Sequence, residues 1–205
     1  MIAIIDYGVG NLFSLKSSLK ALGLDAVVTN DIDTLESADR IILPGVGAFG
    51  DARQKLAAGG LDQAVVRLAR GGKPLLGICL GMQMLFDRSY EFGCHEGLGL
   101  IHGQVRPIKD ELERVGLELK IPQIGWNKLE IVKDHPILKY TKQGEYMYFV
   151  HSYYAADCQA DLIASTSYGV PLTALVARDN VMGAQFHPEK SGEAGLALLK
   201  AFSEI

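Results

Sequence analysis

Short apolar runs alternate with amphipathic segments through the first half of the chain. Residues 1–6, 25–29, 41–43 and 75–78 are rich in Ile, Leu, Val and Ala, which predicts β-strands, with residues 1–6 and 75–78 expected to be buried. Leucines at steps of three and four over residues 12–22 predict a helix, and the apolar spacing of residues 61–70 predicts another. A further helix is expected from about Gly81. This alternation is typical of a parallel sheet with helices on both faces.

The second half has a different pattern, with short strand candidates and little helix between them. These candidates are residues 99–105, 117–121, 128–132, 146–150, 162–167, 173–178 and 181–186. They predict an antiparallel extension of the sheet. Ser191 is expected to cap a closing helix that carries Leu196, Leu199 and Phe202. The expected class is therefore α/β.

Composition narrows this picture to one domain without a nucleic-acid or membrane role. The chain has 205 residues, of which 48% are hydrophobic, so we expect a single domain over residues 1–205. The net charge of −4 gives no basic surface for nucleic acid, and no apolar run reaches membrane-spanning length. The first residues lack the basic region of a secretory signal, and three cysteines show no metal-type spacing. We expect reduced thiols, no metal and a cytoplasmic protein.

Gly8-Val9-Gly10 begins like a dinucleotide-binding fingerprint, but the fingerprint is not completed. Phe13 occupies the position of its third glycine, where close packing of helix on sheet needs a small residue. No nucleotide cofactor is predicted. The loop still follows a strand at its carboxyl end, so it remains a candidate surface for a ligand or partner.

Cys79 is the candidate nucleophile. It lies where an apolar strand gives way to a helix, with Gly77 and Gly81 two residues to either side. This is the arrangement of a nucleophile elbow with sulfur in place of oxygen, in which the turn is sharp and strained. A helix N-terminus favours the thiolate. The alternative is a buried structural cysteine that behaves as a small hydrophobe.

His187, Pro188 and Glu189 are the candidate base and its partner. Proline disfavours helix at the preceding residue, so His187 is expected to be extended. Residues two apart in an extended segment point to the same side, which lets Glu189 orient the imidazole. The alternative is an ordinary solvated loop. His151 lacks a neighbouring carboxylate and is interpreted as a residue on the substrate side.

Acyl transfer at a thiol also needs donors for the developing oxyanion. The N–H of Leu80 follows the nucleophile directly, and a second donor is expected from the loop after the third strand, Pro44-Gly45-Val46-Gly47. Glycines on both sides of Val46 let its peptide rotate at little cost. We hypothesise that the Val46–Gly47 amide is a movable donor that depends on a partner; the alternative is a plain turn.

Together these segments resemble the class I glutamine amidotransferases, the glutaminases with a Cys-His-Glu triad. The matching segments, in order and spacing, are PGVG at 44–47, GICLGMQ at 77–83 and FHPE at 186–189. Other segments look like the glutaminase subunits of imidazole glycerol phosphate synthase: DYGVGNL at 6–12, PGVGAF at 44–49, GWN at 125–127, YFVHSY at 148–153 and QFHPEKS at 185–191. The resemblance covers essentially the whole chain. It implies a flavodoxin-like, three-layer, mostly parallel sheet with the antiparallel extension.

The resemblance also implies roles for individual residues. Cys79 would attack the side-chain amide of glutamine, with His187 transferring protons and Glu189 orienting His187. Gln83 and Glu91 match positions that hold the glutamine, and Glu91 is suited to pair with its α-amino group. Residues His151, Ser152 and Tyr153 match the segment that lines the same pocket.

The family works as a heterodimer, which implies a (β/α)₈-barrel cyclase subunit that receives the ammonia through a tunnel. Asn11, Trp126, Tyr148 and Lys190 match interface positions around the mouth of the glutaminase. Trp126 is the single tryptophan, and its neighbours Gly125 and Asn127 favour a turn over a packed strand. The implied function is glutamine hydrolysis for the synthesis of imidazole glycerol phosphate in histidine biosynthesis.

Three other functions remain open from the sequence. A glutaminase subunit for a chorismate-using synthase keeps the chemistry and changes the pathway; the segments at 125–127 and 6–12 argue against it. A stress or chaperone protein with a cysteine elbow would need neither His187 nor Glu189. A catalytically silent binding module would not need the complete set of three residues.

Overall fold

An eight-stranded sheet forms the centre of the computed structural model, which describes all 205 residues. Its strand order is β2-β1-β3-β4-β14-β13-β12-β9. The first four strands run parallel: β1 (Ile2–Ile5), β2 (Ala26–Thr29), β3 (Arg40–Leu43) and β4 (Leu75–Ile78). All four match predicted strands; β1 and β4 are fully buried as expected, whereas every residue of the edge strand β2 is only partly buried.

The strand β14 (Val181–Ala184) joins the parallel half of the sheet to an antiparallel half. It pairs in parallel with β4 on one side and antiparallel with β13 (Val170–Arg178) on the other. Beyond β13 lie β12 (Leu162–Tyr168) and β9 (Glu130–Ile131), both antiparallel to their neighbours. The expected antiparallel extension is confirmed, and it begins beside the strand that leads to Cys79.

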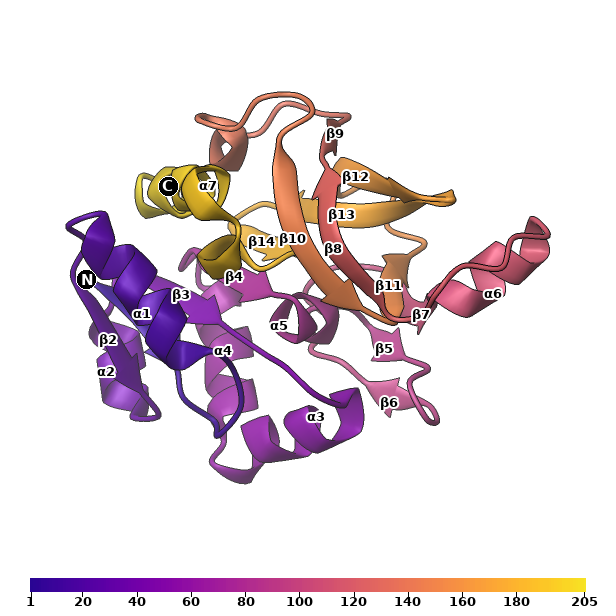
Figure 1. Ribbon diagram of the computed structural model, residues 1–205. Helices are drawn as coiled ribbons and strands as arrows, with labels where there is room; N and C mark the ends of the chain where they lie inside the picture. Colours follow the sequence, from indigo (N-terminus) through magenta and orange to yellow (C-terminus); the bar gives the residue numbers. More distant parts are fainter.

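Helices cover both faces of this sheet (Figure 1). α1 (Leu12–Ala21) and α7 (Gly192–Ser203) pack on one face, and their leucines join a core cluster of 24 buried residues. α2 (Ile32–Ser37), α3 (Phe49–Ala58) and α4 (Leu61–Arg70) pack on the other, in a cluster of 27. Two cores on opposite faces define the three-layer arrangement, because each face buries its own apolar side chains.

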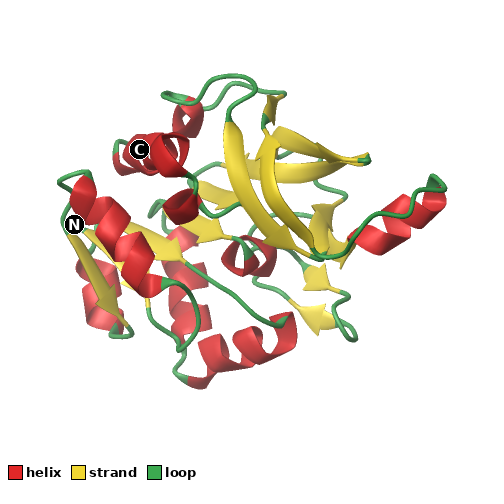
Figure 2. Cartoon of the chain, in the orientation of Figure 1, coloured by secondary structure: helices red, strands yellow, loops and turns green.

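Smaller elements are added beside the antiparallel half, as the strands on the right of Figure 2 show. β8 (Gln123–Lys128) and β10 (Tyr146–His151) form a two-stranded ribbon. A four-stranded sheet is built from β5 (Arg88–Ser89), β6 (His95–Glu96), β7 (Gln104–Pro107) and β11 (Tyr153–Ala156). The remaining helices are α5 (Leu80–Met84), α6 (Ile108–Arg114), and the short 3₁₀ turns η1 (Pro136–Leu138) and η2 (Pro188–Lys190).

Several elements differ from the predictions. Residues 117–121 are not a strand, because no partner strand lies beside them; Leu117 and Leu119 are each 40% exposed next to α6. The strand expected over 99–105 begins only at Gln104. The helices α2, α3 and α6 were not predicted; α2 and α6 span only six and seven residues, which is too short for a helical period to be recognised.

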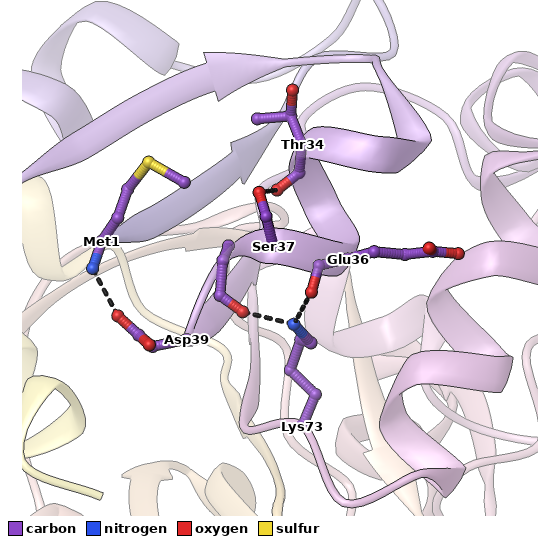
Figure 3. A network of polar contacts seen from close by, with 7 residues as sticks. Met1, Thr34, Glu36, Ser37, Asp39 and Lys73 are labelled. Atoms are coloured by element: carbon purple, nitrogen blue, oxygen red, sulfur yellow. Dashed lines mark hydrogen bonds and ion pairs between the residues drawn. The ribbon is translucent and has the colours of Figure 1, made fainter.

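The C-terminal end of α2 is held by Lys73, which lies just before β4 (Figure 3). Its ammonium group donates to the carbonyl oxygen of Glu36 at 2.7 Å and also to that of Ala38. These carbonyls lack helical partners, so the cation satisfies groups that a helix end leaves free. Nearby, the ammonium group of Met1 lies 2.5 Å from the Asp39 carboxylate. No helix in the structure combines the length and the apolar character needed to cross a membrane.

Candidate active site

Cys79 sits at the sharp turn between β4 and α5. Its φ of 54° and ψ of −111° are strained values for a residue other than glycine. A Cβ on Gly81 would lie 1.9 Å from the Leu43 carbonyl oxygen, and one on Gly77 would lie 2.7 Å from that of Gly81. Only glycine fits at both positions, so the elbow geometry follows from close backbone packing. The helix α5 has five residues, so its dipole gives the thiol less support than a long helix would.

His187 and Glu189 follow β14, the strand next to β4. The backbone N–H of Cys79 donates to the Ala184 carbonyl at 2.7 Å, which fixes the two strand ends side by side. His187 is extended (φ −98°, ψ 98°), as Pro188 predicts. Its Nδ1 lies 2.8 Å from Glu189 Oε1, and both side chains are at most 3% exposed. The imidazole is therefore held by a buried carboxylate.

Opposing influences act on the charge of His187. Burial alone would lower the pKa of its imidazole, but its interactions with Cys79 and Glu189 raise that pKa to about 9. The imidazolium is thus the favoured form of His187 at neutral pH. A cation beside the sulfur favours the thiolate form of a cysteine, which is the nucleophilic form.

A cavity of about 290 Å³ opens in front of these side chains. Its walls contain almost every residue that the sequence analysis assigned to the reaction: Val46, Gly47, Cys79, Leu80, Gln83, Glu91, His151, Ser152, Tyr153 and His187. They come from five segments far apart in the chain: the loop after β3, the elbow with α5, the loop after β5, the end of β10 with the residues that follow it, and the segment after β14. A larger hollow of about 560 Å³ lies beside α6 and contains none of these residues.

The loop between β3 and α3 is held firmly at its base. The Tyr7 hydroxyl donates to the Pro44 carbonyl at 2.7 Å, and a Cβ on Gly45 would lie 2.7 Å from the backbone nitrogen of Gly81. The following residues are less restrained: Val46 is 40% exposed, and Gly47 has a φ of 92° with open space around its Cα. The loop is thus anchored at Pro44 and Gly45 and less restrained at Val46 and Gly47. This suits the hypothesis of a movable Val46–Gly47 amide, which stays a prediction.

Glu91 connects this loop to the substrate side of the cavity. Its Oε2 accepts a hydrogen bond of 2.6 Å from the backbone N–H of Phe49, the first residue of α3. Burial raises the pKa of the Glu91 carboxyl. Opposite it, His151 Nδ1 lies 2.8 Å from the Tyr153 carbonyl, and burial lowers the pKa of His151 to about 4. His151 is therefore neutral near pH 7, with Nδ1 as the donor.

Three of the four expected interface residues, Trp126, Tyr148 and Lys190, lie close together at the β8–β10 ribbon. Trp126 and Tyr148 are directly paired across the two strands, with ring centroids 6.0 Å apart, and Lys190 Nζ lies 5.8 Å from the Tyr148 ring. The expected turn at Trp126 is wrong, because this residue lies inside β8; its exposure of 52% comes from the outward face of the strand. Asn11 precedes α1, but its side chain makes no capping hydrogen bond.

Two residues with close contacts to the site were not identified from the sequence. Tyr7 reaches the oxyanion loop from the end of β1, and Gln185 donates from Nε2 to Cys79 Sγ over 3.8 Å. Gln185 is fully buried. The only signal in the sequence is its place directly before FHPE, where an amide interrupts an apolar strand end. No group of three or more His, Cys, Asp and Glu side chains is arranged to hold a metal ion.

Comparisons with known proteins agree with this geometry. The family model "Glutamine amidotransferase class-I" matches residues 3–204. A protein of Wolinella succinogenes named "Imidazole glycerol phosphate synthase subunit HisH" is 48% identical over 206 residues, covering 100% of both chains. The protein of the same name from Caldanaerobacter subterraneus is 49% identical and covers 100% of this chain and 98% of its own. The solved structure "Structure of PurLQS from Thermotoga maritima" superposes with a TM-score of 0.76 at 20% identity, over 99% of this chain and 97% of that one.

Proposed function

The chain belongs to the class I glutamine amidotransferases and, within them, to the HisH subunits of imidazole glycerol phosphate synthase, and from this premise we propose that it hydrolyses glutamine and supplies the ammonia to a cyclase subunit. The observation that carries the proposal is a buried thiol–imidazole–carboxylate set at the wall of a cavity that fits a small polar substrate. The name of the relatives implies that this ammonia is used to make imidazole glycerol phosphate in histidine biosynthesis.

In the first half of the reaction, the Cys79 sulfur attacks the carbon of the glutamine side-chain amide. The oxygen of that amide gains negative charge and is stabilised by the N–H of Leu80 and by the amide between Val46 and Gly47. The C–N bond then breaks, and His187 gives its proton to the leaving nitrogen, so ammonia departs and a thioester remains. The raised pKa of His187, about 9, keeps this proton available at neutral pH.

In the second half, water attacks the thioester. His187 is now neutral and accepts a proton from the water as it attacks. The C–S bond breaks, glutamate leaves and the sulfur is restored. Glu189 stabilises the imidazolium in both halves through its contact with Nδ1, which also leaves Nε2 to face the sulfur.

Gln83, Glu91 and residues 151–153 are proposed to hold the amino-acid end of glutamine. The half-buried Glu91 carboxylate lines the cavity and suits the α-ammonium group, because a hydrogen bond between two charged groups is stronger than one between neutral groups. The Gln83 side chain is already bonded to the protein through Nε2, at 3.1 Å from the Tyr153 carbonyl. Gln83 therefore contributes by shaping the wall of the cavity.

The proposed partner is a (β/α)₈-barrel cyclase that docks on the outer face of the β8–β10 ribbon and receives the ammonia. Trp126 and Tyr148 supply aromatic surface bordered by Lys190, and Asn11 lines a separate small hollow with Val46 and His187. Tryptophan and tyrosine are enriched in protein–protein interfaces, which supports docking at this surface. Action in the cytoplasm stays a prediction.

A glutaminase assay with and without the cyclase subunit tests the proposal. The isolated chain should turn over glutamine very slowly, and addition of the cyclase with its ligand should raise kcat about 10²–10³-fold, the typical value of an oxyanion donor. Full activity of the isolated chain would contradict the partner-dependent donor. Undiminished turnover in His187→Ala would contradict the mechanism itself and favour a different class of cysteine protein.

The alternative of a chorismate-using synthase predicts a different partner. Pull-down with a barrel cyclase against pull-down with a chorismate-using synthase separates the two. We expect the cyclase to retain this protein and the chorismate-using synthase not to. Trp126→Ala should weaken retention by the cyclase. Retention by the chorismate-using synthase would reassign the pathway and leave the glutaminase chemistry in place.

A further inference from the structure

A chain of hydrogen bonds runs from the substrate-side segment to the sulfur of Cys79 through two buried amides. Gln83 Nε2 donates to the Tyr153 carbonyl at 3.1 Å and to Gln185 Oε1 at 3.0 Å. Gln185 Nε2 in turn donates to Cys79 Sγ over 3.8 Å. Gln83 is 5% exposed and Gln185 is fully buried, so water does not compete for these bonds.

The Tyr153 carbonyl fixes which atom of each amide donates and which accepts. A backbone carbonyl only accepts, so the Gln83 atom that faces Tyr153 must be the nitrogen. That nitrogen uses its second hydrogen toward Gln185, whose facing atom must therefore be the oxygen. The remaining end of the Gln185 amide is its NH₂ group, and it faces the sulfur. The assignment follows from the network and not from a free choice of amide orientation.

A donor aimed at sulfur discriminates between the two protonation states of the thiol. A thiolate accepts hydrogen bonds strongly, whereas a neutral thiol is a weak acceptor. The burial of Gln185 increases this difference, because a hydrogen bond to charge is stronger where water is excluded. The same donor would meet the sulfur again when the thioester breaks and negative charge returns to it.

We propose that Gln185 is a further catalytic residue, which stabilises the anionic sulfur of Cys79 and is locked in its donating orientation by Gln83 and the Tyr153 carbonyl. It supports the sulfur from the side of β14, independently of the His187 imidazole. The role of the Cys79 sulfur as nucleophile rests on the proposed glutaminase function, to which Gln185 adds a second stabilising contact.

These hydrogen bonds also couple the protonation state of the Cys79 sulfur to the substrate pocket. The Tyr153 carbonyl that orients Gln83 also accepts from His151 Nδ1 at 2.8 Å. A shift of residues 151–153 on binding a ligand would therefore reach the sulfur through two amides. This coupling predicts that Gln83 and Gln185 act as one unit.

The test measures alkylation of Cys79 by iodoacetamide as a function of pH, followed on the Cys79 peptide by mass spectrometry. The full chain carries Cys94→Ser in every sample, since Cys94 is exposed. Gln185→Met removes the donor at similar volume. It should move the pH midpoint of alkylation upward by about 1 unit, equivalent to about tenfold slower alkylation below the midpoint. Gln185→Glu keeps the shape of the side chain and should move the midpoint further, because a carboxylate would face the sulfur.

Gln123→Met is the matched control. Gln123 is also a fully buried glutamine, yet its amide has no hydrogen-bond partner and does not line the cavity of Cys79. The midpoint should stay unchanged in this variant. Gln83→Leu should shift it in the same direction as Gln185→Met, and the double variant should shift it by less than the sum of the two.

An unchanged midpoint in folded Gln185→Met or Gln185→Glu would overturn the proposal. Near-ultraviolet circular dichroism establishes folding, and Gln83→Leu supplies an independent measurement if both Gln185 variants fail to fold. Alkylation does not depend on glutamine turnover. A shifted midpoint in a protein that hydrolyses no glutamine even with the cyclase subunit and its ligand present would therefore contradict the proposed function while supporting the role of Gln185.

Discussion

His187 shows how single contacts set the chemistry of this site. Its imidazole is nearly inaccessible to water, which by itself disfavours charge. The Glu189 carboxylate at 2.8 Å and the adjacent Cys79 reverse that effect and raise its pKa to about 9. The sequence places His187 and Glu189 two residues apart, but the degree of burial and the contact with Cys79 are properties of the folded chain.

Glu189→Gln tests the role of this carboxylate at the residue scale. The substitution removes a negative charge that raises the pKa of His187, so the alkaline limb of the pH–kcat profile, near pH 9, should move to lower pH. In the complex with the cyclase, kcat should fall by about 10²–10⁴, as for loss of the orienting carboxylate in a catalytic triad.

The control is Glu193→Gln, which removes an exposed carboxylate from the first turn of α7. Its kcat and pH profile should match those of the unmodified chain. A kcat within a factor of about two of the original in Glu189→Gln would contradict the proposed role.

At the scale of elements, short segments rather than long helices arrange the site. The elbow between β4 and α5, the loop between β3 and α3, and the extended residues after β14 meet at one edge of the sheet. Parallel strands place their carboxyl ends at a common edge, where ligands bind in open α/β sheets. The order of β3, β4 and β14 in the sheet therefore brings these loops together.

Lys73→Met tests how the connection before β4 stabilises a neighbouring element. The Lys73 ammonium group bonds to carbonyls at the end of α2, so its removal leaves them without a charged donor. We expect the free energy of unfolding in urea to fall by about 1.5–3 kcal/mol, typical of a hydrogen bond to a charged group. Lys55→Met, an exposed lysine on α3, is the control and should change stability by less than about 0.5 kcal/mol. Equal losses in the two variants would contradict the capping role.

At the scale of the whole molecule, folding buries His151 at the end of the β8–β10 ribbon. This imidazole lies at the inner end of β10, packs at 5.8 Å from the Phe149 ring, and has a pKa lowered to about 4. An unfolded chain would instead bind a proton at this histidine near its ordinary pKa of about 6.5. Folding therefore disfavours protonation of His151.

This difference predicts acid sensitivity with a defined sign. Between about pH 6.5 and pH 4 the unfolded chain binds more protons at His151 than the folded chain, so stability falls as pH falls through this window. The loss from this group should be about 3 kcal/mol by pH 4, from 1.36 kcal/mol per pKa unit. Urea unfolding of the chain and of His151→Gln at pH 7 and pH 4 measures it. If the variant loses as much stability as the original chain over that interval, the prediction is wrong.

Many of the individual elements were predictable because their signals are local. The runs that form β1 to β4 and the spacing of α4 lie within windows of four to ten residues, and the structure confirms them. The turn expected at Trp126 was wrong, because Gly125 beside it has a φ of 144° within a strand that the long-range pairing with β10 stabilises. The strand expected over 117–121 failed for the converse reason, since no partner strand was available.

The sequence by itself determined the residue types and spacings of the chemistry: a cysteine between glycines, a histidine two residues before a glutamate, and segments that match one family along the whole chain. Such patterns are local and depend on covalent order. Only the tertiary structure decided that Gln185 donates to the Cys79 sulfur, that Tyr7 holds Pro44, and that Glu91 accepts from Phe49. Each of these contacts joins residues 37 or more positions apart, so only the packing of sheet, loops and ribbon sets its distance.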